Sequence, residues 1–187
     1  MAQTDRIETK RLILRRFKES DADEMYNQAK DPAVGPAAGW KPHDNPEESL
    51  EIIKSIFLPA DSFAVTLKEN GHLIGAIALE KDRLRENPDS AEMGYWIGSG
   101  YWGNGYMTEA AEAVLEYGFK TKRLNQIGIC TSSTNERSKR VIKKCGFVYE
   151  GTIRRTLMTY NGSLRDSLVF SMTAEEYEAK RSGEKSC

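Results

Sequence analysis

The pattern of apolar and polar residues predicts a chain that mixes strands and helices. Short stretches rich in aliphatic and aromatic residues, several of them alternating with polar ones, are typical of strands. They cover residues 11–15, 62–68, 72–80, 91–97 and 126–131, and two more strands flank Asn161 and Gly162. The Asn-Gly pairs at 70–71 and 161–162 suit the positive φ angles of tight hairpin turns.

Helical spacing predicts four helices, over residues 20–30, 46–57, 107–120 and 136–145. The first begins with a capped, acid-rich segment, and the last ends at Gly146, which suits a C-terminal cap. Residues 31–45 are rich in Pro, Gly and Ala around Trp40, so we expect a loop that forms one lip of a substrate site.

The length of 187 residues suits a single domain. We assign residues 1–173 to it and residues 174–187 to a polar C-terminal tail, either a frayed helix or a disordered segment. The order of elements predicts a mixed α+β fold, with hairpins at both ends and one β-α-β unit in the middle.

Composition excludes several classes of function. The 27 basic and 28 acidic residues give a net charge of -1, so no broad basic surface is expected for nucleic acid. No apolar run approaches the ~20 residues of a membrane span, and the polar N-terminus does not look like a signal peptide, so we expect a cytoplasmic protein. Cys130, Cys145 and Cys187 lack the spacing of a metal or redox site, and His43 and His72 are isolated, so no metal is expected.

The densest chemical signal is the glycine-rich segment 98–109, between a predicted strand and a predicted helix. Glycines let a backbone approach a ligand closely, and the free N–H groups of a first helical turn attract anions. Residues 98–103 match the dinucleotide pattern G-x-G-x-x-G, but no acidic residue follows the next strand to hold a ribose, so we reject that interpretation. A Walker loop is excluded because no Gly-Lys-Ser/Thr ends the turn.

Three motifs in order resemble the GNAT superfamily of N-acetyltransferases, and within it the ribosomal-protein (Rim-type) enzymes. Residues 102–110 resemble the pyrophosphate loop of the Rim-type enzymes, with Gly100 where the superfamily has Gln or Arg. Residues 135–138 and 144–147 resemble the second half of the cofactor site, and residues 9–15 resemble the opening strand. The resemblance spans roughly residues 7–170.

The resemblance implies a mostly antiparallel twisted sheet of about seven strands with a splayed parallel pair, flanked by about four helices. It implies direct transfer of an acetyl group from acetyl-coenzyme A (acetyl-CoA) to a primary amine in a ternary complex. The acceptor would be the N-terminal amine of a ribosomal or other protein, or alternatively a small-molecule amine. Glu92 would be the base, and Ser138 would protonate the departing thiolate.

The same resemblance assigns the binding residues. For coenzyme binding they are Trp96, Ile97, Trp102, Gly103, Asn104, Gly105, Tyr106, Met107, Thr108, Asn135 and Ser138. Trp40 and Glu92 would contact the acceptor. Neither Cys130 nor Cys145 is expected to be acylated.

Each assignment has a structural alternative. Asn135 suits the N-cap of a helix, Glu92 an exposed strand position, and the aromatic residues ordinary packing. Arg137, Arg140 and Lys144 suit a solvated helix face or the 3′-phosphate of the coenzyme. A non-catalytic acyl-CoA-binding module is the competing function, and both monomer and homodimer stay open.

Overall fold

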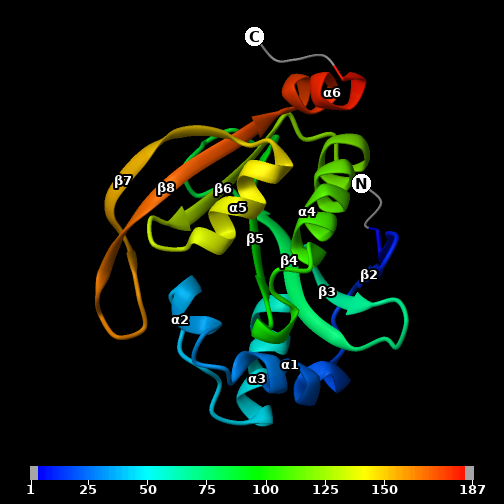
Figure 1. Cartoon of the computed structure of the whole chain (residues 1–187), viewed down its shortest axis with the longest axis vertical. Helices are drawn as coiled ribbons and strands as arrows, with labels where there is room; N and C mark the ends of the chain where they lie inside the picture. The colour runs from blue at the N-terminus through cyan, green and yellow to red at the C-terminus, as the bar shows by residue number, and fades with distance from the viewer. Residues whose placement is uncertain (1–3, 184–187) are drawn as a thin grey trace.

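One mixed sheet organises the molecule. The structure is a computed structural model that describes residues 4–183, and its eight strands lie in the order β1-β2-β3-β4-β5-β6-β8-β7 (Figure 1). The strands are β1 (Arg6–Glu8), β2 (Leu12–Arg15), β3 (Ser62–Leu67), β4 (Leu73–Lys81), β5 (Ser90–Ile97), β6 (Gln126–Ser132), β7 (Val148–Met158) and β8 (Leu164–Thr173). All neighbours are antiparallel except β5 and β6, which confirms the mostly antiparallel sheet expected from the resemblance.

Six α-helices accompany the sheet within residues 4–183. They are α1 (Ala22–Ala29), α2 (Gly35–Ala38), α3 (Pro46–Ile52), α4 (Tyr106–Glu116), α5 (Glu136–Cys145) and α6 (Ala174–Ser182). Helix α3 continues into the π-helical turn Ile53–Phe57, and α4 into Tyr117–Thr121. None of these helices combines the length and apolar character needed to cross a bilayer.

Two apolar cores cover the two faces of the sheet. Side chains alternate along a strand, so Phe63 and Val65 of β3 face the larger core with Val114 and Leu115 of α4. Ala64 points the other way, into a smaller core with residues from α1 and the turn after α3. Every residue of β3 is therefore buried, as in sheets with both faces covered.

The structure adds elements that the sequence pattern did not predict. Strand β1 has three residues and α2 has four, too few to show a period, so the expected counts of about seven strands and four helices were low by these elements and by α6. After Thr173 the helical alternative is the one present: the capping box of Thr173 and Glu176 starts α6, and buried Tyr177 stacks on Phe119 with ring centroids 4.9 Å apart. Residues 184–187 of the expected tail lie outside the described part of the chain.

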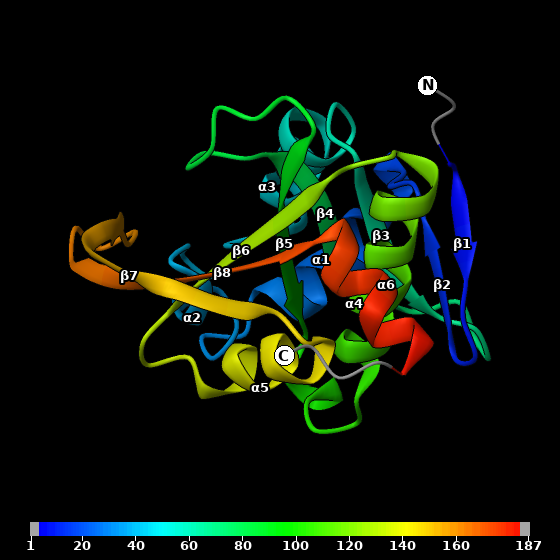
Figure 2. The ribbon, with the colours of Figure 1, turned by 90° about the horizontal axis from the view of Figure 1, so that it is seen from above.

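The middle of the sheet opens into a cleft. The parallel ladder between β5 and β6 pairs Ser90 with Gln126 and Glu92 with Gly128, and ends there. Strand β5 stays paired with β4 as far as Ile97, so its second half diverges from β6. The predicted β-α-β unit and the splayed parallel pair are thus both confirmed, and helix α4 starts beside the opening (Figure 2).

Candidate active site

The glycine-rich turn presents free backbone donors to the cleft. Gly103 and Gly105 have φ angles of 80° and 78°, in the left-handed region that favours glycine. Gly105 is the N-cap of α4 and has no side-chain capping bond. Among the described residues no acceptor pairs with the amides of residues 103–108, while the next amide, that of Glu109, donates to Gly105. The turn therefore offers a set of unpaired N–H groups at a helix N-terminus.

An ion pair that the sequence analysis missed fixes this turn from outside. The Arg11 Nε donates to Glu109 Oε2 at 2.7 Å, and Arg11 Nη1 donates to the carbonyl of Asn104 at 3.0 Å. Thr9 Oγ1 donates to Glu109 Oε1 at 2.6 Å, and the Arg11 guanidinium lies 4.4 Å from the ring centroid of Tyr106. Arg11 and Glu109 both belong to motifs on which the resemblance rests. Their contact joins segments about a hundred positions apart, so no local sequence pattern predicts it.

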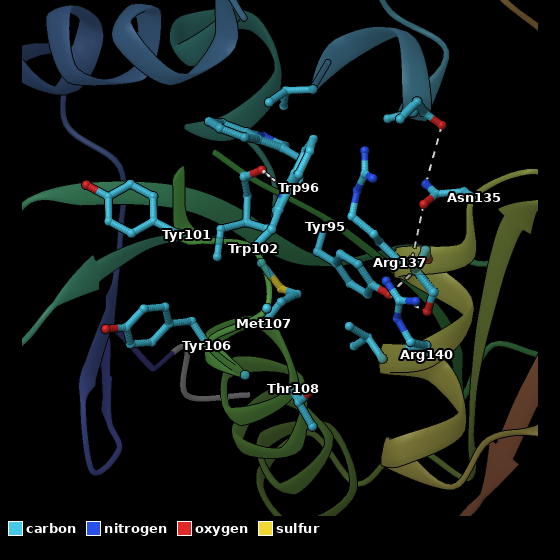
Figure 3. Close-up of a pocket in the computed structure, with 18 of the residues that line it drawn as sticks. Tyr95, Trp96, Tyr101, Trp102, Tyr106, Met107, Thr108, Asn135, Arg137 and Arg140 are labelled. Carbon is cyan, nitrogen blue, oxygen red and sulfur yellow. Dashed lines mark hydrogen bonds between the residues drawn. The ribbon is translucent and has the colours of Figure 1, made fainter. Parts of the chain in front are cut away.

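A cavity of about 500 Å³ lies between this turn, strand β5 and helix α5 (Figure 3). We call it the donor pocket, after the acetyl donor that the resemblance implies. It is lined by all the residues expected to bind the coenzyme except Asn104. Asn104 instead closes the turn, since its side-chain amide donates to the carbonyls of Tyr101 and Trp102. The Trp102 indole donates to the carbonyl of Ile97 at 3.0 Å, which ties the turn to the end of β5.

Three cationic side chains of α5 line the donor pocket. The cavity is bordered by Arg137, Arg140 and Lys144. From the sequence alone these residues also suited a solvated helix face. The Arg137 guanidinium lies 3.6 Å from the ring centroid of Trp102, a cation–π contact that holds it against the glycine-rich turn (Figure 3). The pocket thus combines free backbone donors with positive charge, which suits an anionic ligand.

The N-terminus of α5 places a hydroxyl pair between sheet and helix. Asn135 is the N-cap, and its Oδ1 accepts the Ser138 backbone N–H at 3.2 Å. The Ser138 hydroxyl is thereby left for Tyr95 of β5, whose Oη lies 2.9 Å from Ser138 Oγ (Figure 3). Burial raises the pKa of Tyr95, so its phenol stays protonated at neutral pH and can donate. Tyr95 was not among the expected site residues, because an aromatic residue on a strand suits ordinary packing equally well.

A second cavity of about 980 Å³ adjoins the first, and we call it the acceptor pocket, after the amine acceptor that the resemblance implies. The two share the side chains of Tyr95, Trp96, Asn135 and Ser138 in their walls. Trp40 and Glu92, the residues expected to contact the acceptor, both line the second cavity, and Trp40 meets Trp96 edge-on with centroids 6.0 Å apart. The two pockets therefore meet at the place where the resemblance puts the reacting groups.

Glu92 is almost completely buried at the mouth of the splay. It is 8% exposed, and its carboxylate is held by Arg83, with Nε to Oε2 at 2.8 Å and Nη2 to Oε1 at 2.7 Å. The pairing raises the pKa of Arg83, which stays charged. Glu92 is thus a carboxylate of the acceptor pocket rather than an exposed strand residue. In this structure both of its oxygens accept hydrogen bonds from the Arg83 guanidinium.

The described thiols are poor nucleophiles. Cys130 lines the acceptor pocket, and burial together with the charge of Glu92 raises its pKa to about 11. Burial raises the pKa of Cys145 to about 12. Both stay protonated at neutral pH, and the thiolate is the reactive form. Cys187 lies outside the described residues, and within residues 4–183 no cluster of three or more potential metal ligands occurs.

The loop around Trp40 is fastened to the far hairpin. The Tyr160 backbone N–H donates to the carbonyl of Gly39 at 2.8 Å, and Arg165 Nη1 donates to the carbonyl of Pro36 at 2.9 Å. Hairpin β7–β8 projects from the sheet and reaches over to α2 (Figure 1). Segments far apart in the chain thus close the acceptor pocket on one side.

Known proteins resemble this chain in sequence and in fold. A family described as an acetyltransferase (GNAT) domain matches residues 11–148. The uncharacterized N-acetyltransferase p20 of Bacillus licheniformis is 28% identical over 174 residues, covering 90% of this chain and 96% of its own length. An acetyltransferase (GNAT family) from Bacillus anthracis superposes with a TM-score of 0.81 at 26% identity, covering 91% of this chain and 99% of that one.

A ribosomal-protein acetyltransferase is also among the similar solved structures. The ribosomal-protein-S5-alanine acetyltransferase from Vibrio fischeri superposes with a TM-score of 0.73 at 25% identity, covering 92% of this chain and 98% of that one. The family match covers well over half of the chain and includes β5, the glycine-rich turn and α5. The chain therefore belongs to the GNAT family of acetyltransferases and is an acyltransferase.

Proposed function

We propose that this protein transfers the acetyl group of acetyl-CoA directly to a primary amine, with the N-terminal amine of a ribosomal or other protein as the first acceptor class to test. The observation that carries the proposal is the set of unpaired amides at residues 103–108, facing a pocket that meets the Glu92 pocket at Ser138. GNAT acetyltransferases use acetyl-CoA and an amine acceptor, and the likeness to the S5-alanine enzyme supports a protein N-terminus.

The residues present fit the coenzyme. The free amides of the turn and the N-terminus of α4 would hold its diphosphate, and the cations of α5 would lie beside its other phosphate. Trp96 and Ile97 at the end of β5 would flank its pantetheine arm, because β5 leaves that side unpaired beyond Glu92. When bound, the coenzyme supplies an acetyl group already activated as a thioester.

The protein's own task is to bring the amine to that group and to move protons. We assign Glu92 to take a proton from the acceptor amine, as the nitrogen–carbon bond forms. The carbon–sulfur bond would break in the same transfer, and the Ser138 hydroxyl, hydrogen-bonded to Tyr95, would protonate the departing sulfur. Ser138 would then regain a proton from solvent, and Glu92 would release the amine proton to solvent. A terminal amine, with a pKa of about 7.7 to 8.0, needs less help from a base than a lysine amine at about 10.4.

The raised pKa of Cys130 supports direct transfer. A covalent route would need a thiolate in the acceptor pocket, and burial keeps this thiol protonated. Intact-mass spectrometry of enzyme quenched after mixing with acetyl-CoA should show no acetylated cysteine. An acetyl group on Cys130 that is then passed to the acceptor would contradict direct transfer.

The experiment that tests the proposal follows release of free coenzyme thiol from acetyl-CoA in the presence of acceptors. Peptides with the N-terminal sequences of ribosomal proteins come first, followed by small amines, and each product is identified by its mass. Acetylated α-amines on peptides support the protein acceptor, whereas activity only on small amines replaces it. Tight coenzyme binding with no acetylated product from any amine would instead indicate a non-catalytic acyl-CoA-binding module.

A further inference from the structure

Arg83, the arginine bound to the Glu92 carboxylate, is exposed to the acceptor pocket. The Arg83 side chain is 74% exposed, whereas that of Glu92 is 11% exposed, and both line the cavity. Two of the guanidinium nitrogens are used by Glu92, and the third, Nη1, has no hydrogen-bond partner among the described residues. The arginine therefore faces the space that an acceptor must enter.

The backbone that carries Arg83 is fixed by Asp82, whereas among the described residues its side chain is hydrogen-bonded only to Glu92. Asp82 is 4% exposed, and its Oδ1 accepts the backbone N–H groups of Leu84 and Arg85 at 2.8 and 3.1 Å. Its Oδ2 accepts Arg85 Nη1 at 2.9 Å. Because the backbone on both sides of Arg83 is fixed, the guanidinium would have to leave Glu92 by rotation of its own side chain.

If Arg83 leaves Glu92, another cation has to take its place, because a second carboxylate lies nearby. Glu80 of β4 lies directly opposite Glu92 of β5 in the antiparallel ladder and also borders the acceptor pocket. Like charges opposite each other destabilise a sheet, and Arg83 offsets the repulsion. The ammonium form of an arriving amine can take over this role beside Glu92, provided that another anion receives Arg83.

The ion pair between Glu92 and Arg83 has to open before Glu92 can act as the base. Each oxygen of the Glu92 carboxylate already accepts a hydrogen bond from Arg83, so an arriving amine must compete with the guanidinium for it. Because the Arg83 side chain is largely exposed, a ligand anion can reach its guanidinium and compete with Glu92 for it. Arginine also binds carboxylates in a planar, two-bond geometry that suits this exchange.

We propose that Arg83 binds an anionic group of the acceptor, so that the preferred acceptor is a primary amine that carries a carboxylate close to the amine. This inference rests on the proposed function. As the acceptor carboxylate takes Arg83, Glu92 is released to receive the amine proton. Arg83 is thus a specificity-determining residue, and Glu92 is accessible to acceptors of the right charge pattern.

The test compares acceptors that differ only in the carboxylate. Alanine against alaninamide probes a free amino acid, and Asp-Ala-Ala-amide against Asn-Ala-Ala-amide probes an acidic peptide N-terminus. For wild type we expect at least a tenfold higher kcat/KM for the acidic member of one pair, and that pair identifies the source of the carboxylate. In Arg83→Gln the preference should fall to about one, with the rate on the neutral member raised because Glu92 is no longer occupied.

The control is Lys81→Gln, which removes the same charge from an exposed position two residues away that does not border the pocket. It should keep the wild-type preference if contact, rather than overall charge, matters. Calorimetry with the N-acetylated products provides a second measurement that needs no turnover: the acidic product should bind more tightly than the neutral one to wild type, but not to Arg83→Gln. Equal preference or equal product affinity in wild type and Arg83→Gln would overturn the inference.

The two proposals fail in different ways. If no amine is acetylated at all, the proposed function is wrong, and the product calorimetry still decides whether Arg83 recognises a carboxylate. If peptides and amines are acetylated with no effect of Arg83 on the acidic preference, the proposed function stands and only the role of Arg83 is wrong.

Discussion

The donor and acceptor pockets share a wall but are built in different ways. The donor pocket is formed mostly by consecutive residues from the end of β5, the glycine-rich turn and the start of α4, with one face of α5 added. Its chemistry comes largely from backbone amides. The acceptor pocket draws side chains from α2, β4, β5 and hairpin β7–β8, and its chemistry comes from charges such as Arg83 and Glu92.

Because of this difference, the two pockets should tolerate different substitutions. Recognition by backbone amides depends on φ and ψ angles, so most side-chain changes in the turn leave it intact while a change at Gly105 does not. Recognition by side chains changes with each substitution, so the acceptor pocket is where specificity can vary on a constant donor site. Mutations that affect one pocket without the other test the comparison.

The largest expected effect is at Gly105, on the donor side. Valine there has to adopt a φ of +78° with a β-branched side chain, which distorts the turn and its amides. Two lost hydrogen bonds to a charged group, at about 1.5 kcal/mol each, correspond to about a hundredfold weaker coenzyme binding by calorimetry.

Gly71→Val is the matched control for backbone strain. Gly71 has a φ of +77° in the hairpin turn between β3 and β4, and no atom lies within 4 Å of an added Cβ. This variant should lose stability to a similar extent but keep wild-type coenzyme affinity. Equal affinity for the coenzyme in both variants would show that the turn at Gly105 does not bind it.

On the acceptor side, Glu92→Gln removes the proposed base. Turnover should fall by about 10²- to 10⁴-fold, the range for general-base catalysis, with coenzyme affinity nearly unchanged. The loss should be greatest at acidic pH, where fewer acceptor amines are unprotonated. The measurement is kcat from thiol release between about pH 6 and 9. A rate unaltered across that range would remove Glu92 from the mechanism.

The hydroxyl pair on the shared wall should give a smaller effect. Ser138→Ala keeps the N-cap of α5, because the cap uses the backbone N–H of this residue. A thiolate is a good leaving group, since a free thiol has a pKa of about 8.5, so bond breaking needs little protonation by Ser138. We therefore expect the cost of one lost hydrogen bond, about 1 kcal/mol or about a fivefold fall in kcat, and Tyr95→Phe should behave alike. The double variant should cost less than the product of the two single effects, as measured by single-turnover kinetics. Multiplicative effects would mean that the two hydroxyls act separately.

The smallest effect concerns stability, at two asparagine caps. Asn135 caps α5 beside both pockets, and Asn45 caps α3 by accepting the Glu48 backbone N–H at 2.8 Å. Replacing either by alanine should cost about 1 kcal/mol and lower Tm by about 2–4 °C. Only Asn135→Ala should also weaken coenzyme binding, and a comparable weakening in Asn45→Ala would break the distinction.

The sequence predicted the donor pocket better than the acceptor pocket, because the first is built mostly from neighbouring residues and the second from distant segments. The strand, glycine-rich turn and helix of residues 91–120 lie together in the chain, so local patterns and spacing indicated them. The Asn135 cap was predicted in the same way, from a residue and the helix that follows it.

Contacts between distant segments left no local pattern. The pairing of Arg11 with Glu109 joins the opening strand to α4, and the bond from Tyr160 to Gly39 joins the hairpin to the Trp40 loop. Arg83 was not among the expected site residues, since nothing in the sequence near it indicates that its partner is Glu92. Short elements such as α2 were missed because four residues show no helical period.

The most direct test of the central claim is a titration of ¹⁵N-labelled protein with coenzyme A, following each backbone amide by NMR. Pantetheine, which lacks the phosphates, is the matched control ligand. We predict large shifts at the amides of residues 103–108 with coenzyme A and little change there with pantetheine. Saturable binding of coenzyme A that leaves these amides unshifted would contradict the account.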